Sequence, residues 1–304
     1  MKYYLLIIFF CILIFYFINK KIIIENFDED DKDKDNIEIY DKEFVDLYEI
    51  IYRDYTDIDF DLKIVYSKTL ENNNKPEFLI CGSGIGKLCK KIKEKYKDVI
   101  GVDKSENMLH KSRLLYPNVK FIKGNIIKNN IFDKNKFSHI YIDERTLYYN
   151  KYEDMEKIIK NVFYWLKDNG FLIIQIYNPE KLQLASRYYS SKYMDNKGNI
   201  HGFTYLNDFS HDCYYIKDDS DLNSDIFNYF DKIILDTGHK RIKKTVFCIP
   251  PKEKIYDLIL NNGFEIIHIE KIRIQIVGGY ELAIFKKKNK IISVDELEKN
   301  SLII

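Results

Sequence analysis

The stretch FLICGSGIGKL, residues 78–88, passes from an apolar run into three glycines within five positions, Gly82, Gly84 and Gly86. Glycine has no Cβ, so main-chain N–H groups in such a loop can face a ligand closely at the start of the following helix. The stretch therefore predicts a strand, a tight loop and a helix. The loop is either a ligand-binding loop or a bare turn, and the residues that follow it in the sequence distinguish between the two.

An acidic residue lies at an informative distance from this loop. Asp103 ends the next apolar run, 21 residues beyond Gly82, which is where a carboxylate reaches the two hydroxyls of a ribose. A dinucleotide fingerprint would also need glycine at position 87, where this chain has Lys87. The spacing favours an adenosine-containing ligand and makes a bound pyrophosphate less expected.

Short apolar runs alternate with helical periods from about residue 40 to residue 176, which predicts an α/β fold with parallel strands and helices on both faces. Asn150 and Glu153 resemble a capping box at the start of one helix, and Asn169-Gly170 would end it. From about 180 to 250 the pattern changes to short strands rich in Tyr, Phe and Ile, which predicts a small antiparallel insert. Another helix and two strands follow.

Five segments, in order, carry a resemblance to a known family: FLICGSGIGKL, VIGVDKSENMLHKSR, VKFIKGNI, FSHIYIDERTLYYN and NVFYWLKDNGFLIIQIYNP. Together they resemble the class I S-adenosylmethionine-dependent methyltransferases over about residues 40–179, and the last helix and two strands extend the resemblance. It implies a Rossmann-like sheet of seven mostly parallel strands with the last strand antiparallel. It also implies S-adenosyl-L-methionine as the cofactor, held by Gly82, Ser83, Gly84, Gly86, Asp103, Lys104, Asn125, Ile126 and Asp143.

Two positions depart from the family pattern. Asn125 stands where the family usually has Asp beside the adenine, and its carbonyl can still accept from the exocyclic amine. Ile80 stands where the family has an acidic residue that helps to hold the amino end of the cofactor, which an alkyl group cannot do. We expect weaker binding or a substitute carboxylate, Asp143 or Glu144. A catalytically inactive interaction module is the alternative, and a nicotinamide-dependent oxidoreductase is a more distant one.

Candidates for the chemistry follow the fourth predicted strand. The resemblance places Asp143 near the methyl donor or the acceptor, and Tyr148 and Tyr149 lie a few residues further on; all three are candidate catalytic residues. Tyr40, just ahead of the first predicted helix, could close over the cofactor. The acceptor is a small molecule, a lipid or a protein.

Composition narrows the classes of partner. Lys and Arg number 48 against 47 for Asp and Glu, a formal net charge of +1, so the whole chain provides no field that would attract nucleic acid. The five cysteines include no C-x-x-C pair, and the histidines have no metal-ligand spacing, so we expect no metal site and reduced thiols.

The amino terminus has a different character. Residues 3–18, YYLLIIFFCILIFYFI, are all apolar or aromatic, which predicts a single membrane-spanning helix within residues 1–24. A cleaved signal peptide and a core or amphipathic helix are the alternatives. Lys20-Lys21 after the span favours a globular part that faces the cytosol. The expected order is an anchor (1–24), an acidic linker (25–39), a methyltransferase domain (40–286) and a tail (287–304).

Overall fold

The apolar strand that leads into the glycine loop lies inside a mixed sheet of seven strands. The computed structural model describes residues 40–51, 58–70, 75–143, 145–177, 191–194, 200–206, 209–217, 225–235, 240–272 and 280–289. The sheet order is β11-β12-β5-β4-β1-β2-β3. Its strands are β1 (Glu77–Cys81), β2 (Asp98–Asp103), β3 (Lys120–Lys123), β4 (Phe137–Ile142), β5 (Leu166–Tyr177), β11 (Phe264–Ile272) and β12 (Tyr280–Lys287).

Strand direction agrees with the sequence prediction. β1 pairs in parallel with both β2 and β4, and β4 pairs in parallel with β5. β12 runs antiparallel to both of its neighbours, β5 and β11. The predicted seven-stranded, Rossmann-like sheet with an antiparallel last strand is therefore confirmed.

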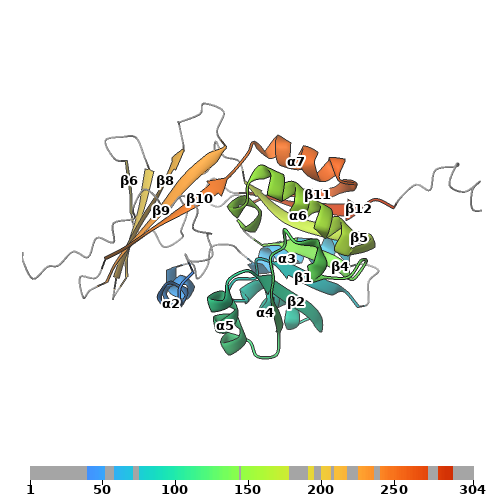
Figure 1. Ribbon diagram of the computed structural model, residues 1–304, viewed down its shortest axis with the longest axis horizontal. Helices are drawn as coiled ribbons and strands as arrows, with labels where there is room; N and C mark the ends of the chain where they lie inside the picture. Colours follow the sequence, from blue (N-terminus) through green and yellow to red (C-terminus); the bar gives the residue numbers. More distant parts are fainter. Residues whose placement is uncertain are drawn as a thin grey trace, which may run out of the picture.

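Helices cover both faces of this sheet, as Figure 1 shows. Side chains alternate between the faces along a strand, so Leu79 and Cys81 of β1 join one core cluster while Phe78 and Ile80 join the other. The first cluster includes residues of α6 and α7, and the second includes residues of α3, α4 and α5. The helices are α2 (Lys42–Ile51), α3 (Ile58–Thr69), α4 (Lys87–Lys93), α5 (Glu106–Leu115), α6 (Tyr152–Trp165) and α7 (Lys252–Asn261), with 3-10 turns η1 (Asn129–Ile131) and η2 (Thr146–Tyr149).

The ends of α6 differ from the sequence prediction. Asn150 does not cap this helix; its side-chain amide donates to the carbonyls of Thr146 (2.9 Å) and Leu147 (3.1 Å) and closes η2 instead. The helix ends at Trp165 and not at Asn169-Gly170, because the backbone is already extended at Leu166. Strand β5 therefore begins at Leu166, and Asn169 makes a left-handed turn within it (φ 60°).

Helix α3 and the buried polar cluster that it brings to the sheet were not predicted from the sequence. Asp61 is 2% exposed, and its carboxylate accepts from the Tyr280 hydroxyl (2.7 Å) and the Gln175 amide (2.9 Å). The Tyr141 hydroxyl donates to the same carboxylate at 3.3 Å. The three donors belong to β12, β5 and β4, so one buried side chain fastens α3 across three strands.

A second sheet fills the segment where an antiparallel insert was expected. It has five strands in the order β10-β9-β8-β7-β6, and every adjacent pair is antiparallel. Its strands are β6 (Ser191–Met194), β7 (Ile200–Leu206), β8 (Phe209–Lys217), β9 (Ile226–Leu235) and β10 (Lys240–Cys248). Figure 1 shows this sheet beside the first one, and the Phe247 ring of β10 lies 4.8 Å from the Tyr149 ring of η2.

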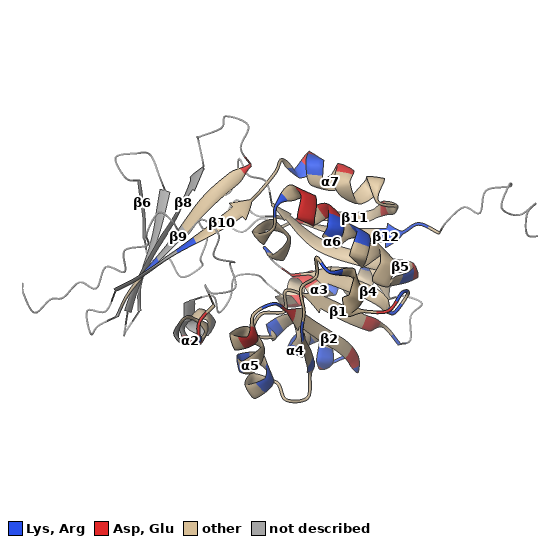
Figure 2. Cartoon of the chain, viewed as in Figure 1, with Lys and Arg blue, Asp and Glu red and all other residues tan. Residues whose placement is uncertain are grey.

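Charges of both signs are interspersed over the helices that cover the seven-stranded sheet (Figure 2). This distribution agrees with the near-zero net charge of the chain. Among the described residues, no helix is long and apolar enough to cross a bilayer. The predicted span at residues 3–18 lies outside the described ranges.

An uncharged histidine lies in the middle of the sheet. The His139 ring of β4 stacks between Phe78 of β1 (4.7 Å) and Phe171 of β5 (5.3 Å), its partners in the strand register. Its Nδ1 lies 2.8 Å from the Ser138 hydroxyl, and burial lowers the pKa of His139 from 6.5 to about 3. The folded protein therefore keeps this ring neutral over a pH range in which the unfolded chain protonates it.

We predict that Asp61→Ala lowers the free energy of unfolding by about 3 kcal/mol, because it leaves buried hydroxyl and amide donors without their acceptor. Urea unfolding of the full chain measures the change. Asp59→Ala is the matched control on the same helix, since Asp59 is exposed and pairs with Lys91 at the surface. It should change stability by less than about 0.5 kcal/mol. Equal stability of the two variants would contradict the role given to Asp61.

A second prediction concerns pH. The unfolded chain binds a proton at His139 below pH 6.5 and the folded protein does so only below about 3, so stability decreases as pH falls through this window. Between pH 7 and 4.5, His139 should lower the free energy of unfolding of the wild type by about 2.5 kcal/mol, and His139→Phe should not show this part of the decrease. Chemical unfolding at several pH values tests it, with the exposed His110→Gln as control. A variant with the same pH slope as the wild type would refute it.

Candidate functional site

The glycine loop has the backbone conformation that its composition predicts. Gly82, Gly84 and Gly86 all have positive φ angles, of 74°, 50° and 88°. The amides of Gly82 and Ser83 donate to the Val102 carbonyl at 2.8 and 3.0 Å, which ties the loop to the end of β2. The loop is therefore positioned by the neighbouring strand as well as by its own turn.

The three glycines are needed for different reasons. A Cβ at Gly82 would lie 1.8 Å from the Thr146 hydroxyl, and one at Gly86 would lie 2.5 Å from the Phe121 ring. A Cβ at Gly84 would meet nothing within 4 Å, and Gly84 lines a cleft. Gly82 and Gly86 thus allow close packing within the protein, whereas Gly84 leaves its backbone open toward a ligand.

Asp103 connects the loop with the next helix. One carboxylate oxygen accepts from the Gly84 amide (2.8 Å), and the other accepts from the Ser105 amide (2.9 Å). Burial raises the pKa of Asp103, and these backbone hydrogen bonds oppose that effect. A carboxylate has about four lone-pair directions, so both oxygens can still accept from the hydroxyls of a ligand.

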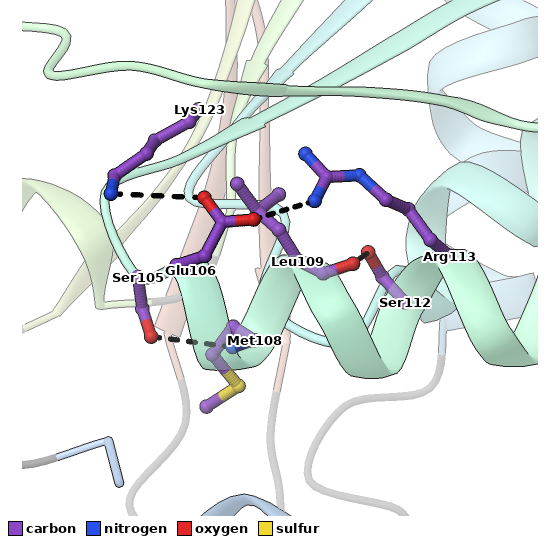
Figure 3. A network of polar contacts seen from close by, with 7 residues as sticks. All are labelled: Ser105, Glu106, Met108, Leu109, Ser112, Arg113 and Lys123. Atoms are coloured by element: carbon purple, nitrogen blue, oxygen red, sulfur yellow. Dashed lines mark hydrogen bonds and ion pairs between the residues drawn. The ribbon is translucent and has the colours of Figure 1, made fainter. Parts of the chain in front are cut away.

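The start of α5 forms the adjoining wall. The Ser105 hydroxyl caps the helix by accepting from the Met108 amide at 3.3 Å, and Met108 lines the cleft. Behind this turn Glu106 pairs with Arg113 (2.7 Å) and Lys123 (3.7 Å), which joins α5 to the end of β3 (Figure 3). These charges lower the pKa of Glu106 and lie at the surface, so they support the wall without entering it.

The cleft holds about 150 Å³ and lies at the carboxyl ends of β1, β2 and β4, where ligands of open α/β sheets bind. Its lining comes from the glycine loop, the end of β2, the loops that follow β2, β3 and β4, and residues of α2, α3, α4, α5 and η2. The lining residues are Tyr40, Tyr48, Ile58, Gly82, Ser83, Gly84, Ile85, Gly86, Lys87, Leu88, Val102, Asp103, Lys104, Ser105, Met108, Gly124, Ile126, Asp143, Arg145, Thr146, Tyr149 and Asn150.

Most of the predicted site residues meet at this cleft. Those that line it are Gly82, Ser83, Gly84, Gly86, Asp103, Lys104, Ile126, Asp143 and Tyr149. Asn125 is not among the lining residues; its side-chain oxygen accepts from the Ile127 amide at 3.1 Å in a local turn. Tyr148 is fully buried and accepts from the Tyr177 amide at 3.1 Å, so the structure places it in the core and not among the residues that line the cleft.

Ile80 does not face the cleft. It is fully buried and packs with Leu62 and Val65 of α3 in the core on that face of the sheet. Asp143 does line the cleft, and its amide donates to the Cys81 carbonyl (3.0 Å), so the end of β4 lies beside the start of the glycine loop. Glu144, the other substitute carboxylate suggested by the sequence, lies outside the described residues.

A pair of tyrosines closes one side of the cleft. The hydroxyls of Tyr40 and Tyr149 are 2.6 Å apart, and Asn107 of α5 donates to the Tyr40 carbonyl at 2.8 Å. Burial and the neighbouring Tyr149 raise the pKa of Tyr40, while the positive charge of Arg145 opposes that rise. Tyr40 thus lines the cleft as a neutral phenol, and its closure over the cofactor stays a prediction.

Sequence reasoning missed Arg145, although it lies in the same DERTLYYN run as Asp143 and Tyr149. Arg145 is 8% exposed, lines the cleft and contacts the rings of Tyr229 (5.6 Å) and Phe247 (5.4 Å). A single arginine in a loop gives no local signal of burial. The burial of Arg145 depends on residues far away in the sequence, because both rings belong to the second sheet.

Comparison with known proteins agrees with this geometry. Residues 78–170 match the family described as "Methyltransferase domain". No curated protein matches the sequence. The match covers the glycine loop, Asp103, the β4 loop and α6, and together with the structural likeness below it supports a methyltransferase.

Several solved methyltransferase structures have the same fold. An S-adenosylmethionine-dependent methyltransferase from Clostridium acetobutylicum ATCC 824 is 16% identical with a TM-score of 0.64, over 81% of this chain and 98% of that one. CcbJ from Streptomyces caelestis is 17% identical with a TM-score of 0.63, over 82% and 100%. CalS10 from Micromonospora echinaspora, an amino pentose methyltransferase with bound S-adenosylmethionine, is 12% identical with a TM-score of 0.61, over 80% and 97%. At these identities the likeness establishes the class I methyltransferase fold.

The different surroundings of the glycines generate a prediction. Gly84→Ala should cost about 1 kcal/mol in stability, because the only penalty is a left-handed backbone with a side chain. Gly82→Ala adds a collision with Thr146 to the same backbone penalty and should cost about 3 kcal/mol. Urea unfolding compares the two variants. A Gly84→Ala protein that is the less stable of the two would contradict this assignment.

Proposed function

We propose that this chain transfers a methyl group from S-adenosyl-L-methionine to an acceptor in the cleft. The observation that carries the proposal is the junction at Gly84, where an open backbone position in the cleft is hydrogen-bonded to the carboxylate that ends β2. A glycine-lined backbone, one half-buried carboxylate and apolar walls suit an adenosine that lacks phosphates.

The residues present fit this cofactor. The backbone of Gly82, Ser83 and Gly84 would lie along its methionine part, and both oxygens of Asp103 would accept from the ribose hydroxyls. Met108 and Ile126 provide apolar surface in the cleft and Lys104 flanks it, as expected for an adenine pocket. When bound, the cofactor supplies a methyl group already activated by its sulfonium.

The amino end of the cofactor needs a carboxylate that Ile80 cannot supply. We assign this role to Asp143, because it lines the cleft beside the start of the glycine loop. An ammonium group and a carboxylate in a partly buried cleft attract each other more strongly than they would in water. The amino group of the cofactor would then be held by Asp143 in place of an acidic residue at position 80. It would still have a charged partner, in a different direction.

The chain's part in the chemistry is alignment, exclusion of water and, where the acceptor carries a proton, its removal. Tyr40 and Tyr149 would cover the reacting atoms. Asp143 is the candidate base of the described lining, and Tyr149 is the candidate for orienting the acceptor. Tyr148, buried below them, would support the floor of the cleft.

Isothermal titration of the purified chain with S-adenosylmethionine tests the proposal. Asp103→Ala should weaken binding tenfold or more, since it removes both the ribose acceptor and the contact that orients Gly84. Asp98→Ala, at the exposed start of the same strand, is the control and should bind as the wild type does.

Absence of binding by the wild type at millimolar cofactor would favour the alternative, a catalytically inactive module that uses the fold for interaction. Binding of a reduced nicotinamide dinucleotide in its place would point to an oxidoreductase.

We propose further that residues 3–18 anchor the protein in a membrane as a single span, with the globular part facing the cytosol. Support comes from the sequence alone: sixteen consecutive apolar or aromatic residues, with Lys20-Lys21 after them. Such an anchor would place a lipid or a membrane-associated molecule within reach of the cleft as acceptor.

Membrane extraction with carbonate tests the anchor. The full chain should stay in the membrane fraction, and a chain without residues 1–24 should move to the soluble fraction, because the apolar segment is gone. Release of the full chain by carbonate would count against the anchor.

A further inference from the structure

The two edge strands of the seven-stranded sheet differ in how they are protected. β3 at one edge has four residues and begins and ends with an exposed lysine, and short length and lysines are the usual protection of an open edge. β11 at the other edge has nine residues, and among the described strands it pairs only with β12. β11 therefore offers a long row of outward backbone N–H and C=O groups to a further strand.

β11 also exposes several large apolar side chains. Ile266, Ile267 and Ile269 are 43%, 41% and 36% exposed and lie within one short stretch of the strand. A single exposed isoleucine needs no explanation, but apolar side chains gathered on an open strand edge are typical of a surface that another chain covers. A strand that pairs with β11 would satisfy its outward backbone groups and remove these side chains from water.

We propose that a second copy of this chain provides that strand, with the two β11 strands antiparallel about a two-fold axis at Ile269. Ile269 then lies opposite Ile269 of the other copy, and His268 lies opposite Glu270 on both sides of the axis. The β-bulge of β11 falls between Ile266 and His268, so residues 268–272 form a regular stretch for this pairing. Both copies use the same edge, so the assembly closes as a dimer. This dimer does not depend on the proposed function.

Charge complementarity selects the position of the axis. Within one strand the Nε2 atom of His268 and a carboxylate oxygen of Glu270 are already 3.0 Å apart. Directly opposite residues of antiparallel strands lie on the same face of the sheet, so each His268 would also meet Glu270 of the other copy. An axis at Glu270 would set two carboxylates against each other, and an axis at His268 would remove both His–Glu pairs between the copies. The axis at Ile269 avoids both outcomes.

Crosslinking of the full chain in detergent tests the contact at the axis. Ile269→Cys places two thiols directly opposite each other, where the Cα atoms of antiparallel strands are about 4.5–5.5 Å apart and a disulfide can form. Mild oxidation should give about tenfold more covalent dimer than the wild type, whose own cysteines provide the background. Leu114→Cys is the control because Leu114 is 67% exposed on α5, outside the proposed contact. It should stay at the wild-type level.

A charge exchange tests the register. Two copies of the wild type with different affinity tags should co-purify after coexpression. Glu270→Lys sets the introduced lysine against His268, and His268→Glu sets the introduced glutamate against Glu270, so each variant should co-purify with itself about tenfold less than the wild type does. The two variants should co-purify with each other at the wild-type level, because one pair is then native and the other joins the two introduced charges.

Glu265→Lys is the matched control, because Glu265 is an exposed acid on β11 that precedes the bulge and lies outside the pairing. This variant should co-purify with itself as the wild type does. Recovery by the mixed pair also shows that Glu270→Lys and His268→Glu are both folded.

The dimer would be refuted by wild-type copies that do not co-purify, or by Ile269→Cys that crosslinks no more than Leu114→Cys. Single variants at His268 and Glu270 that keep wild-type co-purification would assign the association to another surface, such as the apolar residues 3–18, and would overturn the proposal as well. Deletion of residues 290–304 is the last arm. Dimers that appear only after this deletion would show that the chain's own tail pairs with β11 in place of a second copy.

Discussion

The site depends on one carboxylate that bridges two backbone amides. Asp103 ends β2, and its two oxygens accept from Gly84 in the glycine loop and from Ser105 at the start of α5. These bonds fix the open face of Gly84 and the first turn of α5 relative to each other. The sheet brings the partners together, because β1 and β2 are parallel neighbours whose carboxyl ends meet at one edge. A ligand that enters there meets the glycine-lined backbone on one side and a half-buried carboxylate on the other.

Much of this arrangement could be predicted from the sequence, because local residue patterns and spacings determine it. The three glycines specify a left-handed loop, and the 21 residues to Asp103 fit one helix and one strand between adjacent loops. What was missed depends on contacts between distant segments. From the sequence alone Asp61 is expected at the surface, because the donors that surround it lie on β4, β5 and β12. Arg145 is likewise expected to be an exposed loop residue, because the ring that covers it belongs to the second sheet. The sequence also did not distinguish the two adjacent tyrosines. The turn of η2 directs the Tyr148 side chain into the core and the Tyr149 side chain to the cleft.

Ile80 illustrates how a departure from a family pattern can be compatible with the fold. Its side chain fills the core between β1 and α3, so the strand keeps its packing and the loop keeps its shape. Asp61 lies on the same face, bound by the hydroxyl of Tyr141, the residue opposite Ile80 in the register of β1 and β4. The carboxylate on that face thus fastens α3 to the sheet, whereas Asp143 lines the cleft. The division of these tasks follows from position and not from residue type alone.

The most direct measurement of this account is a crystal structure of the protein with S-adenosylhomocysteine. We predict ribose hydroxyls within hydrogen-bonding distance of Asp103, the homocysteine chain along Gly82 to Gly84, and its amino group facing Asp143. A ligand bound elsewhere, or a cleft closed by side chains so that the ribose cannot approach Asp103, would contradict the central claim.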